Sequence, residues 1–401
     1  MVSTDKNKID EVLTRSINTI YPSKKELEKR LLSGEKLTFY MGIDPTADYV
    51  HLGHSTNYLI LERLHNLGHK IIVLVGDFTA MIDDPSDKNS MRTQLSAEQV
   101  NKNLETFKIQ IGKILNFDDK ENPIEFRFNS KWLAKFTFKD AVELASNFTV
   151  QQMIERDAFK KRLNEQKPLY VHEFFYPLMQ GYDSVALNTD CEIGGTDQTF
   201  NMLAGRVLLK RYKDKEKFVI TTTLLENPET GEKLMSKSLG TGIGVNERSE
   251  DMFVKIMKFP DCTIRQLFID CTRLPMLEVE RYITKMNNGE NPRDIKLILA
   301  HEIVKMYHGE KAADDARDFW LSTISEKTNQ NTIELLVSDV CQIEAIAATA
   351  ASVSKSQLRR LVKQGAVRLN GKKVSDLSRE DFCSGDVLSI GKKNNFKLNL
   401  N

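Results

Sequence analysis

The sequence has few of the residues that mark exported, metal-stabilised or membrane proteins. Five cysteines occur among 401 residues, far apart and without a Cys-x-x-Cys pair, which argues against a disulfide framework and a structural zinc site. No run approaches the ~18 consecutive apolar residues that a membrane-spanning helix needs. Residues 1–16 lack the apolar core of a signal peptide and the arginine-rich character of an organelle-targeting segment. We therefore expect a cytoplasmic protein with free thiols, no metal site and no membrane contact.

The chain also has almost no net charge. Its 57 Lys and Arg against 56 Asp and Glu sum to +1, which by itself disfavours a polyanionic partner. The two signs are unevenly distributed, however. Residues 351–401 contain 11 basic and 4 acidic residues, a net +7, which leaves 46 basic and 52 acidic residues, a net −6, for the preceding chain. The sequence therefore predicts a basic module attached to an acidic body.

Alternating strand and helix patterns over residues 1–225 predict an α/β domain. The first unit is a strand at 37–44, a helix at 51–67 and a strand at 71–77, whose continuous apolar run is typical of a buried parallel strand. The other expected elements are a helical segment over 1–36, helices at 96–115 and 138–162, and strands at 124–129, 184–190 and 217–225. Together they predict a doubly wound, mostly parallel sheet of Rossmann type.

The chain beyond residue 225 has a different pattern. Residues 226–325 combine a glycine-rich polar loop at 227–244 with helical periodicity, and 326–340 form a polar stretch typical of a linker. Residues 341–401 predict a small, basic α+β module. We expect four segments with these boundaries.

The segment PTADYVHLGH, Pro45–His54, lies between the first expected strand and its helix. His51 and His54 share one face of the first helical turn, where free backbone N–H groups and the helix dipole favour anions. Two imidazoles there can bind phosphate, and Gly53 between them lets a flat group such as adenine approach the backbone. The alternatives are a pair of surface or capping histidines, or a zinc pair whose third ligand is not visible nearby.

The segment GEKLMSKSLG, Gly231–Gly240, lies in the glycine-rich loop. Lys233 and Lys237 can close over a triphosphate and offset the charge that builds on departing pyrophosphate. The alternative is that these lysines are merely solvated.

HLGH followed much later by MSKS resembles the two signature motifs of class I aminoacyl-tRNA synthetases. Three further segments narrow the resemblance to tyrosyl-tRNA synthetases of bacterial type: YMGIDPTADYVHLGH, YPLMQGYD and EIGGTDQ. In the second, Tyr176, Gln180 and Asp183 follow i, i+4, i+7 spacing and share one helical stripe. The alternative is that the aromatic residues are core and the carboxylates are helix caps.

The resemblance implies a set of substrate-binding residues. At the tyrosine they are Tyr40 and Asp183 on the phenolic hydroxyl, Tyr176, Gln180 and Asp84 on the α-ammonium group, and Gln198 near the carboxylate. At the nucleotide they are Thr46 and His51 at the γ-phosphate, His54 near the α-phosphate, Gly194 and Asp197 at the ribose, with Gly42, Asp44, Gly53 and Lys237. Lys88 and Arg92 match basic residues on a loop that approaches pyrophosphate and the tRNA acceptor end.

Some positions depart from the family pattern. The loop motif usually opens with lysine, but Leu234 occupies that place and Lys233 precedes it. Met41 stands where some members have a cysteine that bonds the ribose, and Asn57 stands where they have threonine.

Residues 354–374 resemble an S4 RNA-binding domain. Leu358, Leu361 and Val362 form an apolar stripe on the expected helix, and Asn370-Gly371 marks a hairpin. The residues expected to meet tRNA phosphates are Arg359, Arg360, Lys363, Lys372 and Lys373. The alternative is a solvated charged helix.

The reaction that the resemblance implies is tyrosine activation by ATP, followed by transfer to tRNA(Tyr). Mg²⁺ is expected to travel with ATP rather than sit in a protein cage. The family also implies a homodimer. Two other functions stay open at this point: a tryptophanyl-tRNA synthetase, and an RNA-binding or splicing cofactor derived from a synthetase.

Overall fold

The computed structural model describes residues 1–46, 49–82, 96–235, 241–330, 332–337, 343–377, 382–391 and 394–400. It divides into two compact units, Met1–Ala316 and Arg317–Asn401. The finer division into four segments stays a prediction. No helix among the described residues is long and apolar enough to cross a membrane.

A six-stranded sheet forms the centre of the first unit, in the order β1-β6-β5-β2-β3-β4. Its strands are β1 (Ile17–Tyr21), β2 (Thr38–Ile43), β3 (Lys70–Val75), β4 (Glu125–Phe128), β5 (Cys191–Gly195) and β6 (Phe218–Thr222). All neighbouring strands pair in parallel except β1, which pairs antiparallel with β6 at the edge. The expected doubly wound α/β fold is confirmed.

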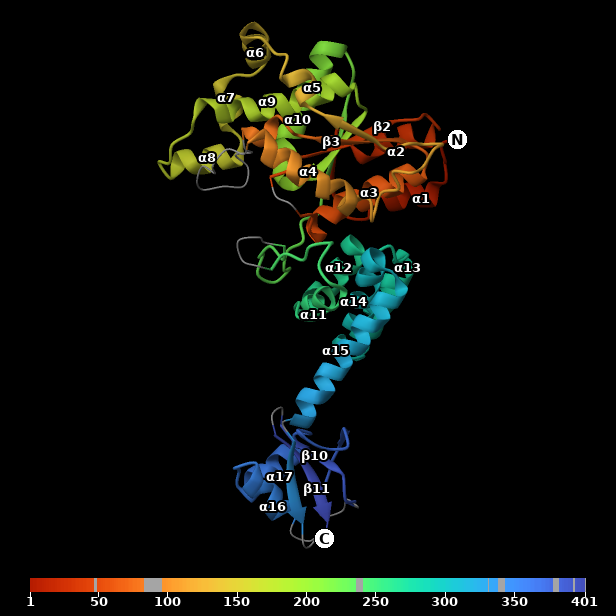
Figure 1. Cartoon of the computed structure of the whole chain (residues 1–401), viewed down its shortest axis with the longest axis vertical. Helices are drawn as coiled ribbons and strands as arrows, with labels where there is room; N and C mark the ends of the chain where they lie inside the picture. The colour runs from red at the N-terminus through yellow and green to blue at the C-terminus, as the bar shows by residue number, and fades with distance from the viewer. Residues whose placement is uncertain are drawn as a thin grey trace. The chain divides into compact units, whose positions relative to one another are not determined.

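The strand order locates the point where this sheet reverses direction. From β2 the chain moves outward through β3 to β4, and from β5 it moves outward the other way to β6. Because parallel crossovers are right-handed, the helices of the two halves cover opposite faces, and a crevice opens at the carboxyl ends of β2 and β5. Figure 1 shows α3 (Leu52–Asn66) and α10 (Thr199–Lys213) on different sides of the central strands.

Helices surround this sheet and continue beyond it. Besides α3 and α10, the helices before β6 are α1 (Lys6–Val12), α2 (Lys24–Leu32), α4 (Ala97–Ile111), α5 (Ser130–Leu133), α6 (Phe138–Ala145), α7 (Val150–Ile154), α8 (Asp157–Asn164) and α9 (Phe175–Leu187). Those after it are α11 (Ser249–Met257), α12 (Ile264–Cys271), α13 (Met276–Asn287), α14 (Pro292–His308) and α15 (Glu310–Gln330). The helical segment expected after the sheet is confirmed.

Three sequence-based assignments in this unit are wrong. Residues 1–36 contain the edge strand β1 as well as two helices. The local pattern did not reveal this strand, because its pairing partner β6 lies far away in the chain. The strand expected at 184–190 is wrong, because residues 184–187 form the last turn of α9. A short apolar run fits both the helical and the strand period. The strand itself is β5, which begins at Cys191 and contains two glycines. The single helix expected at 138–162 is three short helices, because Thr137 and Thr149 each cap a new start.

The second unit contains a five-stranded sheet in the order β7-β11-β10-β8-β9. Its elements are β7 (Thr332–Val337), α16 (Ile343–Ala350), α17 (Lys355–Lys363), β8 (Val367–Leu369), β9 (Lys372–Lys373), β10 (Val387–Ile390) and β11 (Asn394–Leu400). Asn370 and Gly371 turn between β8 and β9 with φ of 49° and 82°, as the expected Asn-Gly hairpin requires. The polar stretch expected as a linker includes the end of α15 and the whole of β7, which pairs in parallel with β11.

Candidate active site

Asp44 ties three elements together where the parallel strands end. It follows β2, and its Oδ2 accepts a 2.7 Å hydrogen bond from the Tyr176 hydroxyl on α9. Its Oδ1 accepts a 2.7 Å bond from Thr79, which follows β3. A Cβ on Gly76 would lie 1.8 Å from the same oxygen, so only glycine leaves room for it. Asp44, expected at the nucleotide, therefore has a structural function in joining β2, β3 and α9.

The two histidines of HLGH cap α3 reciprocally. His51 is the N-cap, its Nδ1 accepts from the His54 backbone N–H at 3.3 Å, and His54 Nδ1 accepts from the His51 N–H at 3.4 Å. Their rings stack with centroids 3.6 Å apart. Burial lowers the pKa of His54 well below its ordinary value, and neighbouring His51 lowers it further. The two histidines therefore cap the helix, and phosphate binding by them stays a prediction. Because each Nδ1 accepts a hydrogen bond, each ring can donate only through Nε2.

The second signature segment meets the first in space. A Cβ on Gly53 would lie 3.4 Å from the Met235 Cβ, at the start of MSKS. After that motif, Ile243 accepts from the Leu52 N–H at 3.0 Å, and the Val245 N–H donates to the Val50 carbonyl at 2.9 Å. The residues flanking the loop motif therefore pack on the start of α3.

The lysines of this loop are placed only in part. Lys233 is exposed, and its backbone pairs with Glu226. Leu234, at the position where the family has lysine, is buried. Lys237 lies outside the described residues, as do Asp84, Lys88 and Arg92 of the other basic loop.

Two residues expected at the phenolic hydroxyl lie in the buried part of the site. The Tyr40 hydroxyl on β2 hydrogen-bonds Ser184 Oγ at 2.7 Å. Asp183 on α9 accepts from Trp132 Nε1 at 2.7 Å and from Asn129 Nδ2 at 3.3 Å. Burial raises the pKa of Asp183 well above its ordinary value, although these two hydrogen bonds act in the opposite direction. Burial likewise raises the pKa of Tyr40, and the nearby carboxylates of Glu192 and Asp183 add to the shift.

Gln180 and Gln198 are linked by a residue that sequence reasoning missed. Asn201 Nδ2 on α10 donates to the side-chain oxygens of both, at 2.9 Å each. Gln180 Nε2 in turn donates to Glu192 Oε1 at 3.2 Å. Sequence reasoning also missed Glu192, the first residue of the EIGGTDQ segment. The signal that could have identified it is a carboxylate in a strand next to two glycines.

The remaining residues expected at the nucleotide, which are Gly194 and Asp197 at the ribose, Thr46 at the γ-phosphate and Gly42, range from exposed to buried. Asp197 is exposed, and a Cβ on Gly195 would lie 2.4 Å from its Oδ1. Gly42 is exposed with open space where a Cβ would stand, and Thr46 is half-buried, with its N–H bonded to the Asp44 carbonyl at 2.8 Å. A Cβ on Gly194 would lie 3.1 Å from Met202 Sδ.

The two departures from the family pattern at Met41 and Asn57 are both buried. Asn57 Oδ1 accepts a 2.7 Å hydrogen bond from Thr222 Oγ1 and so joins α3 to β6. Asn57 therefore has a structural hydrogen bond between these two elements.

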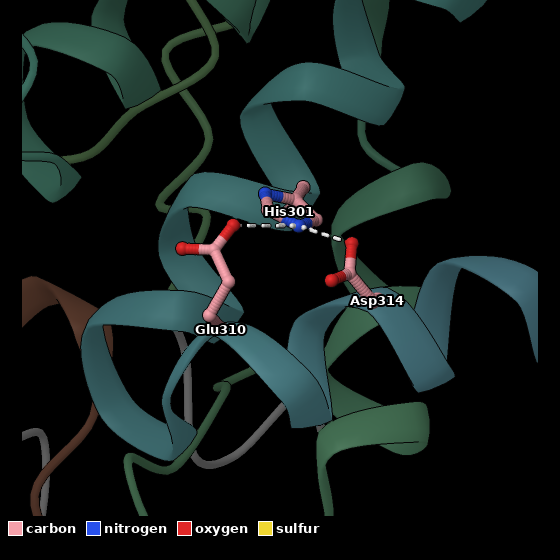
Figure 2. A group of neighbouring side chains, drawn as sticks. All are labelled: His301, Glu310 and Asp314. Carbon is pink, nitrogen blue, oxygen red and sulfur yellow. Dashed lines mark hydrogen bonds and ion pairs between the residues drawn. The ribbon is translucent and has the colours of Figure 1, made fainter.

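Within the described residues, one cluster has the composition of a metal site. His301, Glu310 and Asp314 face one another across the junction of α14 and α15 (Figure 2). His301 Nε2 lies 3.1 Å from Asp314 Oδ1 and 3.8 Å from Glu310 Oε1. Lys305 forms a 2.6 Å ion pair with the other oxygen of Glu310. The cluster acts as an ion-pair network that joins two helices.

The basic face expected on the S4-like module is exposed. Arg360, Lys363, Lys372 and Lys373 all present exposed side chains. Arg359 differs, because Glu344 on α16 binds its guanidinium through both carboxylate oxygens. The hydrogen bond and ion pair with Glu344 raise the pKa of Arg359.

Comparisons with known proteins agree with this architecture. Residues 32–324 match the family described as tRNA synthetases class I (W and Y), and residues 350–380 match the S4 domain. Tyrosine–tRNA ligase 2 of Clostridium acetobutylicum is 45% identical over 381 residues, 93% of this chain and 94% of that protein. Tyrosine–tRNA ligase of Carboxydothermus hydrogenoformans is 41% identical over 406 residues, 97% of each chain.

Solved structures share the fold at lower sequence identity. A C-terminally truncated mitochondrial tyrosyl-tRNA synthetase of Aspergillus nidulans gives a TM-score of 0.66 at 21% identity, covering 79% of this chain and 94% of that one. Tyrosyl-tRNA synthetase of Archaeoglobus fulgidus, complexed with L-tyrosine, gives 0.61 at 22% identity, covering 78% and 100%. Its family match over residues 32–324 and its relatives at 41–45% identity agree with the packing of HLGH against the residues on either side of MSKS, and the chain belongs to the tyrosyl-tRNA synthetase family of class I tRNA synthetases.

Proposed function

We propose that this chain activates L-tyrosine with ATP, giving tyrosyl-adenylate and pyrophosphate, and then transfers tyrosine to the 3′-terminal adenosine of tRNA(Tyr). The observation that carries the proposal is the meeting of HLGH, the flanks of MSKS and the polar stripe of α9 at one crevice. The curated relatives named above are tyrosine–tRNA ligases, which favours tyrosine over tryptophan. The packed signature segments favour an enzyme over an RNA-binding factor alone.

The first step needs no general base. The tyrosine carboxylate is already ionised when it attacks the α-phosphorus, so catalysis depends on positioning and on charge stabilisation. His51 and His54 act as neutral Nε2–H donors toward the phosphates, with Thr46 beside them. Lys237, assisted by Lys233, offsets charge on the departing pyrophosphate.

Recognition of tyrosine depends on buried polar groups. Tyr40 and Asp183 bind the phenolic hydroxyl, so phenylalanine would leave each of these buried groups short of one hydrogen bond. Tyrosyl-tRNA synthetases are themselves the established example of this form of specificity. Tyr176, Gln180 and Asp84 hold the ammonium group, and Gln198 lies near the carboxylate.

ATP binds across the outer part of the crevice. Gly42, Gly53 and Gly194 leave room for the nucleotide, and Asp197 binds the ribose. The Asp44 carboxylate is already bonded at both oxygens, which fits Mg²⁺ that is held by the phosphates and water rather than by this residue. Lys88 and Arg92 approach pyrophosphate and the tRNA acceptor end.

The tRNA binds the S4 domain through exposed cations, chiefly Arg360, Lys363, Lys372 and Lys373, with Arg359 held by Glu344. The enzyme works in the cytoplasm, where tRNA and ATP are available.

The expected result of Asp183→Asn is a loss of about a hundredfold in kcat/KM for tyrosine, because the carboxyl group that binds the phenol is replaced by an amide, which is a weaker acceptor. ATP–pyrophosphate exchange measures it. Asp270→Asn is the matched control, since Asp270 is equally buried on α12 and bonds Thr223. Turnover by Asp183→Asn at the wild-type level would contradict the assignment of the phenol site.

Lys237→Ala should slow adenylate formation by at least about tenfold in single-turnover experiments, because a cation facing the departing pyrophosphate is lost. Lys233→Ala, one residue before Leu234, tests whether this lysine replaces the missing one and should give a smaller loss. An unchanged rate in Lys237→Ala would refute the proposed function of this loop.

Removal of the S4 domain should separate the two steps. A chain ending at Gln330 loses β7 together with its partner β11 and leaves α15 complete. We expect tRNA charging to fall by about a hundredfold, through lost phosphate contacts, while tyrosine-dependent exchange stays within about twofold. A full-length chain with Arg360, Lys363 and Lys373 changed to Gln should show the same separation, and equal loss of both activities would argue against it.

A homodimer is proposed from exposed apolar side chains between β4 and α9. Phe138, Val142, Val150 and Val171 are 86%, 53%, 66% and 77% exposed, which is unfavourable unless another surface covers them. Sedimentation equilibrium should give a molecular mass of twice the 45.9 kDa chain mass. The Phe138→Asp variant should give the mass of the monomer. A wild-type protein that stays monomeric at micromolar concentration would exclude the dimer.

A further inference from the structure

A buried ion pair lies beneath the tyrosine-binding residues. Lys217, immediately before β6, pairs with Glu192 on β5, and their side chains are 0% and 1% exposed. The ammonium group also donates to Ser184 Oγ at 2.8 Å and lies 5.8 Å from the centre of the Tyr40 ring. A buried lysine is costly unless it is paired and hydrogen-bonded, and here both conditions are met.

The pair contacts groups at both ends of the proposed tyrosine site. On one side Ser184 connects it to the Tyr40 hydroxyl, at 2.7 Å. On the other side Glu192 Oε1 accepts from Gln180 Nε2 at 3.2 Å. The proposed function assigns Tyr40 to the phenol and Gln180 to the ammonium group of the substrate.

Lys217 fixes one hydrogen-bond direction in this network. It can only donate, so Ser184 Oγ accepts from it. The Ser184 and Tyr40 hydroxyls share a 2.7 Å hydrogen bond in which either oxygen can be the donor, and Ser184 Oγ also lies 3.4 Å from Glu192 Oε2. The network therefore holds the Tyr40 hydroxyl in place through Ser184.

The packing of α9 and α10 is adapted to this pair. A Cβ on Gly205 would lie 2.5 Å from Lys217 Nζ and 2.6 Å from Ser184 Oγ. A Cβ on Gly181 would lie 3.0 Å from the Gly205 backbone nitrogen. Two glycines thus let the helices approach and leave the space that the ammonium group fills.

We propose that Lys217 and Glu192 are positioning residues for tyrosine, holding Tyr40 through Ser184 and Gln180 directly. The proposal rests on the proposed function, since it takes the tyrosine site as given. The side-chain contacts of the pair run to Tyr40, Ser184 and Gln180, which are residues proposed for tyrosine or bonded to one, so the pair should affect tyrosine more than ATP.

The test uses the double variant Lys217→Met/Glu192→Gln in the full-length chain. It removes both charges at similar volume, which buried ion pairs often tolerate, whereas a single change leaves one buried charge unpaired. We expect the KM for tyrosine to rise at least about tenfold, the KM for ATP to stay within about twofold, and discrimination against phenylalanine to fall about tenfold. Lys215→Met is the matched control, because Lys215 pairs with Asp190 at 2.9 Å, away from this network.

Ser184→Ala provides a second test if the double variant does not fold. It breaks the link to Tyr40 while both charges stay paired, and it should reduce discrimination against phenylalanine with little effect on the KM for ATP. A wild-type KM for tyrosine in the double variant, wild-type discrimination in Ser184→Ala, or equal changes for tyrosine and ATP would overturn the proposal. A wild-type enzyme without tyrosine-dependent exchange would instead refute the proposed function itself.

Discussion

The ion pair between Lys217 and Glu192 joins the strands β5 and β6 to the helices above them at the centre of the first unit. Two buried charges are tolerated in a protein interior only when partners and hydrogen bonds are complete. That condition constrains Ser184, the glycines of α9 and α10, and the position of the Tyr40 hydroxyl. The shape of the inner crevice therefore depends on one electrostatic contact as well as on apolar packing.

The outer crevice is set by topology. The sheet reverses its strand order between β2 and β5, and the loops leaving their carboxyl ends meet there. Asp44 joins the ends of β2 and β3 to α9, while residues 243–245 pair with the residues that start α3. Groups for the amino acid and groups for the nucleotide are thereby held side by side on rigid elements, as a reaction driven by positioning requires.

Charge is divided between the two units in keeping with their partners. A catalytic body that handles a zwitterion and ATP needs only a few placed cations, and its sum is negative. The C-terminal tail is strongly basic, and most of the cations expected to meet RNA are exposed there. Arg359 is exposed too but differs from the others in being ion-paired with Glu344 on α16. A net charge near zero thus conceals a nucleic-acid-binding domain.

Local sequence patterns predicted several elements of the fold and of the candidate site. The βαβ unit, the stripe on α9, the S4 helix and the Asn-Gly turn were predictable because each depends on residues close in sequence. The edge strand β1, the true position of β5 and the partners of Asp44 and Glu192 were not, because each depends on contacts far along the chain. Motifs name the residues of a site, but hydrogen-bond partners and buried charge pairs form only when the folded chain brings distant groups together, since unpaired they would be too costly to bury.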